Sequence, residues 1–208
     1  MMKMKKIYGL VLIGGKSRRM RAEKWRMEYA GCSQARQGYE LLAEFCSKVF
    51  LSKRPEQVLG KAEGDFPCIV DRAEYRGIGP LGGILSAMKK YPQAAWLVLA
   101  CDLPFVTPRT IRELMRKRNP RKPATAYIDL SNRLPEPLCA IYEAMSRKHL
   151  LRFFRAGMVC PREILQNCGA ELVPPKEKFA LQNINTPREY RAARRRFRLP
   201  RPEKARAR

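Results

Sequence analysis

The run Trp96-Leu97-Val98-Leu99-Ala100-Cys101-Asp102 decides the fold of this 208-residue chain. Its first five residues are apolar, which predicts a short strand that is covered on both faces. The strand stops at a cysteine and a carboxylate. Residues 7–13 form a second apolar run, which ends at Gly14 and Gly15. Strands that end in such residues predict a binding edge at the carboxyl ends of a sheet.

Short apolar runs alternate with helical patterns along the rest of the chain. Further strands are expected at residues 49–51, 68–70, 125–128, 138–142 and 171–173. Helices are expected at residues 39–46, 80–91, 108–116, 146–154, 161–166 and 187–197. This alternation predicts a single-domain, three-layer, Rossmann-like α/β fold with a mostly parallel sheet. We expect one domain over residues 1–198 and a basic, disordered tail over residues 199–208.

The chain is strongly basic, with 43 Lys and Arg residues against 19 Asp and Glu residues and a net charge of +24. Such a surface attracts anions, including nucleotides, phosphorylated metabolites and nucleic acid. Seven cysteines without C-x-x-C spacing and a single histidine argue against a zinc site and favour a reducing, cytoplasmic compartment. No apolar run approaches the ~20 residues of a membrane span.

The glycine-rich loop after the first strand points to phosphate binding. Gly14-Gly15-Lys16-Ser17 is not a P-loop, because that motif requires glycine where this chain has Leu10. Two glycines at a strand end still let backbone amides approach a phosphate closely. Lys16, Arg18, Arg19 and Lys24 add positive charge to the same loop. The alternative is a solvated basic turn.

Polar residues at other strand ends offer further candidates. Asp102 is placed to bind Mg²⁺ through carboxylate oxygens, and Asp71 ends another strand in the same way. Either carboxylate could instead cap a helix or order a loop. Residues 79–83 form a simple turn or a backbone surface for a base or ribose. Asn183, Asn185 and Thr186 precede the last helix, where ordinary capping is the alternative.

Five blocks in this order resemble one family. They are residues 10–20 (LVLIGGKSRRM, with Glu23 and Lys24 after them), 79–84 (GPLGGI), 96–105 (WLVLACDLPF), 135–139 (PEPLC) and 183–187 (NINTP). Together they are similar to the signature blocks of the molybdenum cofactor guanylyltransferases, which belong to the nucleotidyltransferases with a Rossmann-like sheet. The resemblance covers roughly residues 5 to 192.

The resemblance implies a role for each matching position. Lys24, Arg19 and Asp102 would be catalytic, with Arg19 and Lys24 on the triphosphate. Asp102 would bind Mg²⁺, and Asn185 would complete the metal or acceptor site. The implied nucleotide-binding positions are Leu12, Ile13, Gly14, Gly15, Lys16, Ser17, Lys24, Lys53, Asp71, Gly79, Pro80, Leu81, Gly82 and Asp102. Glycine at position 14 goes with guanine in this family, whereas relatives that use cytosine tend to carry alanine.

The implied reaction is Mg²⁺-dependent transfer of GMP from GTP to a molybdopterin-type cofactor, with release of pyrophosphate. Proteins of cofactor biosynthesis and molybdoenzymes would be its partners. Three positions depart from the family pattern: Arg21 replaces a glycine, Glu23 an aspartate and Lys53 an asparagine. The alternatives are use of CTP, a sugar-phosphate acceptor, or an inactive basic protein that binds nucleic acid or a partner, which the basic tail favours.

Overall fold

The computed structural model describes residues 6–15, 23–29, 31–61, 63–130, 132–177 and 179–198. The main sheet has seven strands in the order β5-β4-β1-β6-β8-β7-β9. Their bounds are β1 (Ile7–Leu12), β4 (Lys48–Lys53), β5 (Cys68–Val70), β6 (Ala95–Ala100), β7 (Ala124–Ile128), β8 (Pro135–Tyr142) and β9 (Glu171–Val173). A separate two-stranded hairpin consists of β2 (Glu28–Tyr29) and β3 (Cys32–Ser33).

The sheet is mostly parallel, as predicted. Strands β5, β4, β1 and β6 pair in parallel, and so do β7 and β9. Strand β8 is antiparallel to both of its neighbours, β6 and β7. The four adjacent parallel strands therefore bring their carboxyl ends to one edge of the sheet.

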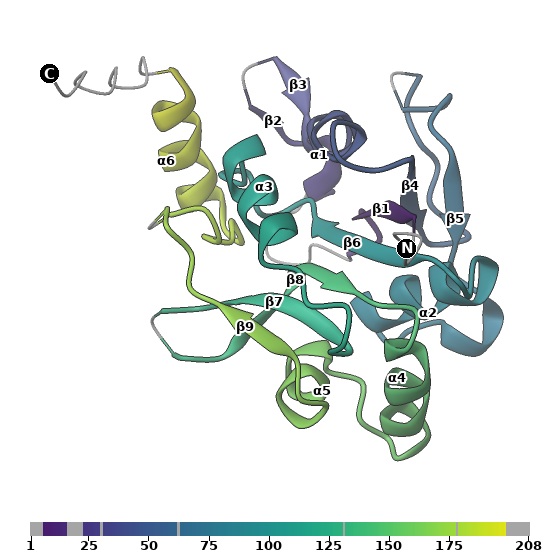
Figure 1. Ribbon diagram of the computed structural model, residues 1–208. Coiled ribbons are helices and arrows are strands. Elements are labelled where there is room, and N and C mark those ends of the chain that lie inside the picture. The colour runs from purple at the N-terminus through teal and green to yellow at the C-terminus, as the bar shows by residue number, and fades with distance from the viewer. Residues whose placement is uncertain are drawn as a thin grey trace, which may run out of the picture.

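Helices cover both faces of the sheet, which gives the three predicted layers (Figure 1). The helices are α1 (Gln34–Ala43), α2 (Pro80–Lys90), α3 (Pro108–Arg116), α4 (Ser146–Arg155), α5 (Pro161–Asn167) and α6 (Pro187–Arg198). In the view of Figure 1, α1 and α3 lie above the sheet, and α2, α4 and α5 lie below it. No helix among the described residues is both long and apolar enough to cross a bilayer.

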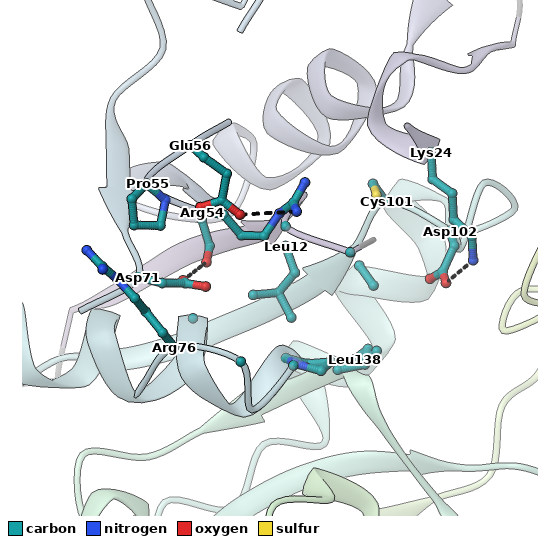
Figure 2. Close-up of a pocket in the computed structure, with 18 residues that line it drawn as sticks. Leu12, Lys24, Arg54, Pro55, Glu56, Asp71, Arg76, Cys101, Asp102 and Leu138 are labelled. Atoms are coloured by element: carbon teal, nitrogen blue, oxygen red, sulfur yellow. Dashed lines mark hydrogen bonds and ion pairs between the residues drawn. The ribbon is translucent and has the colours of Figure 1, made fainter. Parts of the chain in front are cut away.

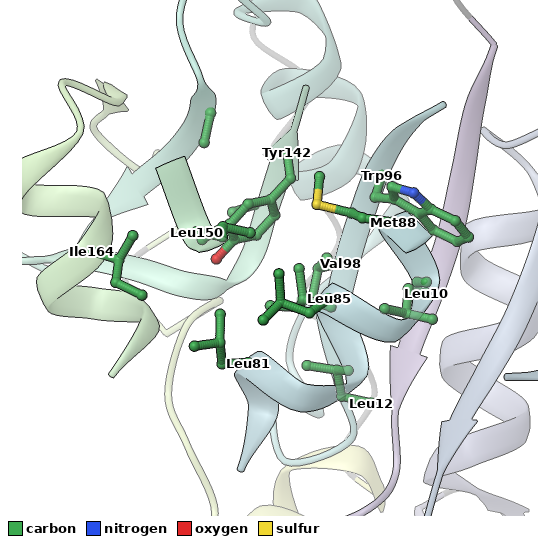
Figure 3. Close-up of a cluster of buried hydrophobic side chains, with 14 of the residues drawn as sticks. Leu10, Leu12, Leu81, Leu85, Met88, Trp96, Val98, Tyr142, Leu150 and Ile164 are labelled. Carbon is green, nitrogen blue, oxygen red and sulfur yellow. The ribbon is translucent and has the colours of Figure 1, made fainter. Parts of the chain in front are cut away.

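The position of β6 between two layers of helices explains why its sequence is apolar throughout. Trp96 and Val98 belong to the hydrophobic core on the α2 side of the sheet. Leu97 and Leu99 belong to the second core, which includes residues of α1 and α3. Successive side chains of a strand point to opposite faces, so a strand between two helical layers has no polar face. Figure 3 shows Leu85 of α2 among these side chains on the first face.

Some boundaries differ from the predicted ones. Helix α1 begins at Gln34, five residues before the predicted start at 39, because the Ser33 side chain accepts a hydrogen bond from the backbone amide of Arg36. The β2–β3 hairpin was not predicted, since two-residue strands carry no periodicity. The predicted cap of α3 is confirmed, with Thr107 and Thr110 forming a capping box. The proposed tail, 199–208, lies outside the described residues.

Gly82 on α2 packs directly against backbone, and this contact can be tested. A Cβ atom at this position would lie 2.3 Å from the carbonyl oxygen of Tyr75. Gly82→Ala should therefore lower the free energy of unfolding by about 1–3 kcal/mol, the usual cost of overpacking. Urea unfolding measures the change. Gly64→Ala is the control, because its Cβ would meet its nearest neighbour at 3.4 Å. Equal stability of the two variants would contradict the packing argument.

Candidate active site

A cavity of about 820 Å³ opens at the carboxyl edge of the parallel strands. Its walls come from the ends of β1, β4, β5 and β6, from the start of α2 and from β8. The lining residues are Leu12, Gly14, Gly15, Lys24, Ser52, Arg54, Pro55, Glu56, Asp71, Arg76, Gly77, Gly79, Pro80, Gly83, Ala100, Cys101, Asp102 and Leu138. Figure 2 shows Lys24 and Asp102 at one end, Asp71 and Arg76 at the other, and Leu12 between them.

Three side chains from distant parts of the chain meet beside the first end of the cavity. The Lys24 ammonium lies 3.0 Å from Asp102 Oδ2 and also donates to Asn185 Oδ1. Asn185 is brought to this place by its neighbour, because the Ile184 amide donates to the Asp102 carbonyl at 3.0 Å. The cluster therefore joins residues that are up to 161 positions apart in the sequence.

The chain around Lys24 is anchored by apolar packing. Lys24 begins a single 3-10 turn, and the next residue, Trp25, is buried in the α1-side core. The Gln34 amide at the start of α1 donates to the Met27 carbonyl at 2.9 Å. These contacts determine where the turn lies, so the ammonium is positioned by the fold of the core.

The donor set suits a divalent metal with oxygen ligands. Asp102 Oδ1 is buried and has no hydrogen-bond partner among the described residues, although an unpaired carboxylate oxygen is costly to bury. Asp102 Oδ2 and Asn185 Oδ1 already accept from a cation. Carboxylate and amide oxygens are ligands that Mg²⁺ prefers, and this ion usually takes only one or two protein carboxylates. The residues present therefore fit Mg²⁺ better than zinc.

Asp71 stands at the opposite end of the cavity, directly after β5. Its backbone amide donates to the Lys53 carbonyl at 2.9 Å, and its carboxylate accepts from the Ser52 hydroxyl at 3.4 Å. Burial raises the pKa of Asp71 to about 6, because a low-dielectric environment disfavours the ionised form. The hydrogen bond from Ser52 and the charge of Arg54 act in the opposite direction. A half-buried carboxylate at a ligand edge is suited to accept hydrogen bonds from a base or ribose.

Glycines keep the cavity open where backbone approaches it. Gly79 has a φ of 65°, a left-handed conformation that favours glycine, and it caps the start of α2. A Cβ atom on Gly15 would meet nothing within 4 Å, so the space beside its α-carbon is open. A Cβ atom on Gly83 would lie 2.3 Å from the Ser52 hydroxyl. The chain can therefore bring α2 close to β4 only with glycine at position 83.

Comparison with known proteins identifies the family. The model of the MobA-like NTP transferase domain matches residues 9–172, most of the chain. The chain belongs to this family. It is 33% identical to a probable molybdenum cofactor guanylyltransferase of Bacillus velezensis, over 87% of this chain and 91% of that protein. Membership makes the chain a nucleotidyltransferase, and the cavity described above is where such an activity would reside.

Two further similar proteins support the same family assignment. The chain is 38% identical to a molybdenum cofactor biosynthesis bifunctional protein of Synechocystis over 88% of its own length. It spans only about half, 52%, of that longer protein. The crystal structure of molybdopterin-guanine dinucleotide biosynthesis protein A from Archaeoglobus fulgidus superposes with a TM-score of 0.73 at 25% identity, covering 90% of this chain and 97% of that one.

Eight of the predicted nucleotidyltransferase site residues line the cavity. They are Leu12, Gly14, Gly15, Lys24, Asp71, Gly79, Pro80 and Asp102. Asn185 joins them through Lys24. Lys16, Ser17 and Arg19 lie outside the described residues, as does Arg21.

Four predicted nucleotide-binding positions do not line the cavity, each for a structural reason. Ile13 is buried, and its amide and carbonyl are bonded to the Ser52 carbonyl and the Gln57 side chain. Leu81 is fully buried in the α2-side core. Gly82 packs on Tyr75, as described above. Lys53 donates from its ammonium to the Gln57 carbonyl at 3.1 Å.

The resemblance implied a nucleotide contact at Lys53, whereas the structure places its neighbour Arg54 on the cavity wall. Ser52 and Arg54 line the cavity while Lys53 does not. Side chains two positions apart share a face of an extended segment, whereas neighbours do not. This alternation is a signal that could have pointed from Ser52 to Arg54. Leu138 and Cys101 were missed because apolar lining residues resemble core residues in sequence.

The raised pKa of Asp71 predicts a stability effect with a definite sign. The pKa of Asp71 in the folded protein lies above its ordinary value. The protonated carboxyl group therefore contributes fully to stability when the pH is below the ordinary pKa, and this contribution is lost as the pH rises through about 6. Asp71→Asn, which cannot ionise, should therefore melt at a higher temperature than wild type near pH 7.5. The difference should shrink as the pH falls towards 5. Thermal unfolding across this range measures it, and a constant difference would contradict the assignment.

Proposed function

We propose that the chain transfers GMP from GTP to the phosphate of a molybdopterin-type cofactor in the cytoplasm, with release of pyrophosphate. The observation that carries this proposal is the Lys24–Asp102–Asn185 cluster beside the cavity that ends at Asp71. The names of the relatives from Bacillus velezensis and Archaeoglobus fulgidus supply the choice of guanine and of acceptor. Glycine at position 14, which goes with guanine in the family pattern, supports the same choice.

The chemistry requires positioning and charge neutralisation. An oxygen of the acceptor phosphate attacks the α-phosphorus, and a new oxygen–phosphorus bond forms. The bond from the α-phosphorus to the oxygen bridging to the β-phosphate breaks, and that oxygen leaves with pyrophosphate. The acceptor is already anionic, so no side chain has to remove a proton. Mg²⁺, when bound, would offset the negative charge of the reacting phosphates.

The chain's own residues orient the reactants. Asp102 and Asn185 would hold the metal through their side-chain oxygens. The Lys24 ammonium lies within reach of the same place and would contact the triphosphate. The backbone of Gly14 and Gly15 leaves room for phosphate oxygens. Asp71 would accept hydrogen bonds from the nucleoside at the other end of the cavity.

Loss of either charged residue of the cluster should abolish most turnover. We expect Asp102→Ala and Lys24→Ala to lower kcat by at least ~100-fold, comparable to the removal of one preorganised charge contact. Formation of the guanine dinucleotide is the measurement. Asp65→Ala is the control, since it removes an exposed carboxylate outside the cavity.

Calorimetry with GTP, CTP and ATP, each with Mg²⁺, tests which nucleotide the protein binds. Preference for CTP would move the product to the cytosine dinucleotide and overturn the choice of GTP.

The position of Lys24 predicts that metal binding depends on nucleotide. Its ammonium contacts the two oxygens that would bind the metal, Asp102 Oδ2 and Asn185 Oδ1. A divalent ion must therefore displace this cation, which the phosphates of the nucleotide would then receive. Without nucleotide, Lys24→Met should bind Mn²⁺ about tenfold more tightly than wild type, a change of ~1.4 kcal/mol. Paramagnetic resonance of free Mn²⁺ measures the affinity.

Lys89→Met is the matched control, because it removes an equal charge from an exposed lysine that pairs with Glu74. Equal Mn²⁺ affinity in wild type and Lys24→Met would show that the ammonium does not compete with the metal.

A further inference from the structure

The turn that follows β4 is tied to the end of β1 by one buried amide side chain. Gln57 is 4% exposed. Its Nε2 donates to the Ile13 carbonyl at 3.1 Å, and its Oε1 accepts from the Arg54 amide at 3.3 Å. Both ends of the amide are therefore used to hold residues 54–57 against the strand that leads into Gly14. The backbone of Arg54 is positioned by this contact.

The Arg54 side chain lies against the glycine loop and inside the cavity. Its Cγ would be 3.4 Å from a Cβ atom on Gly14. Figure 2 shows it between Glu56 and Leu12, towards the middle of the cavity. The side chain is only 22% exposed. The fold therefore holds a guanidinium over the cavity floor, where the proposed function places a nucleotide.

Two carboxylates compensate the charge of the Arg54 guanidinium, but they do not use all of its hydrogen-bond donors. Nη1 lies 3.3 Å from Glu56 Oε1, and Nη2 lies 3.6 Å from Glu23 Oε1. Nε is buried and has no hydrogen-bond partner among the described residues. A buried N–H without an acceptor costs free energy, so a ligand acceptor at this point would be favoured.

The two carboxylates decide which part of a nucleotide would be accepted. A phosphate beside Arg54 would meet the negative charges of Glu23 and Glu56 at close range. A neutral carbonyl oxygen or ring nitrogen would meet no such repulsion and would still accept from the guanidinium. Figure 2 shows Arg54 and Glu56 nearer to Asp71 than to Asp102, so the guanidinium lies between the middle of the cavity and the Asp71 end. That end would receive the base if Lys24 and Asp102 receive the phosphates.

We propose that Arg54 is a specificity-determining residue that donates hydrogen bonds to O6 and N7 of guanine, and that Gln57 is its positioning residue. The proposal rests on the proposed function. Arginine is suited to this contact because its planar fork matches the two acceptors on that edge of guanine. Adenine has an amino group in place of O6, so its hydrogen-bond donor would face the N–H donors of the guanidinium.

Base analogues test the proposal without turnover. The probes are GTP, 2,6-diaminopurine riboside triphosphate, which replaces O6 by an amine, and 7-deaza-GTP, which lacks N7. Calorimetry with Mg²⁺ gives each affinity. Wild type should bind the diaminopurine nucleotide at least about tenfold more weakly than GTP, and 7-deaza-GTP several-fold more weakly. Arg54→Met should weaken GTP about tenfold and bring the three affinities close together.

Two variants complete the experiment. Arg72→Met is the charge control, because it removes an arginine beside Asp71 that pairs with Glu74 and does not line the cavity. It should keep the discrimination of wild type. Gln57→Leu should lose part of the discrimination, and the double variant with Arg54→Met should be no worse than Arg54→Met alone.

The outcomes separate this inference from the proposed function. If wild type prefers GTP and Arg54→Met weakens all three nucleotides by the same factor, the guanidinium contacts phosphate or ribose and the inference is wrong. If Arg54→Met changes none of them, Arg54 has no ligand role. If wild type itself does not prefer GTP to CTP and ATP, the proposed function has failed, and that result is visible before any variant is made.

Discussion

The parallel register between β1 and β6 is the constraint on which the site depends. Leu12 pairs with Ala100, and the hydrogen bond from the Cys101 amide to the Leu12 carbonyl carries the pairing one step further. Gly14 and Asp102 each lie two residues beyond that last pair. The glycine loop and the carboxylate are therefore neighbours because the two strands are in this register. A slip of one residue would also turn every core side chain of β6 to the wrong face.

The strand ends could be predicted from sequence because apolar runs stop abruptly there. Asp71, Asp102 and Gly14 all stand just after such a run, and all three line the cavity. The three-layer arrangement follows for the same reason, since a strand without a polar face must be covered twice. The start of α1 was predicted less accurately because the Ser33 cap was not recognised, whereas the Thr107 cap of α3 was.

Contacts between distant segments could not be predicted from local pattern. Strand β8 is antiparallel to β7 because only residues 129–134 join the two strands, but no residue within β8 records that it also pairs with β6. The metal or acceptor role of Asn185 was implied by resemblance alone, because nothing near it in the sequence indicates that Lys24 is its partner. The resemblance named Lys53, and an aligned position does not show that the neighbouring Arg54 faces the cavity.

The position of helix α6 has a consequence for how the protein folds while it is being translated. Helix α6 packs on the β2–β3 hairpin through Tyr29 and Tyr190, whose rings meet edge to face, and the Thr186–Glu189 cap orders the residues around Asn185. During synthesis, the segment around Asn185 must leave the ribosome before its side-chain oxygen can reach Lys24, which lies 161 positions earlier. The sheet can form earlier, during translation. A nascent chain that has not yet reached Asn185 would therefore lack one of the oxygen atoms proposed to hold the metal.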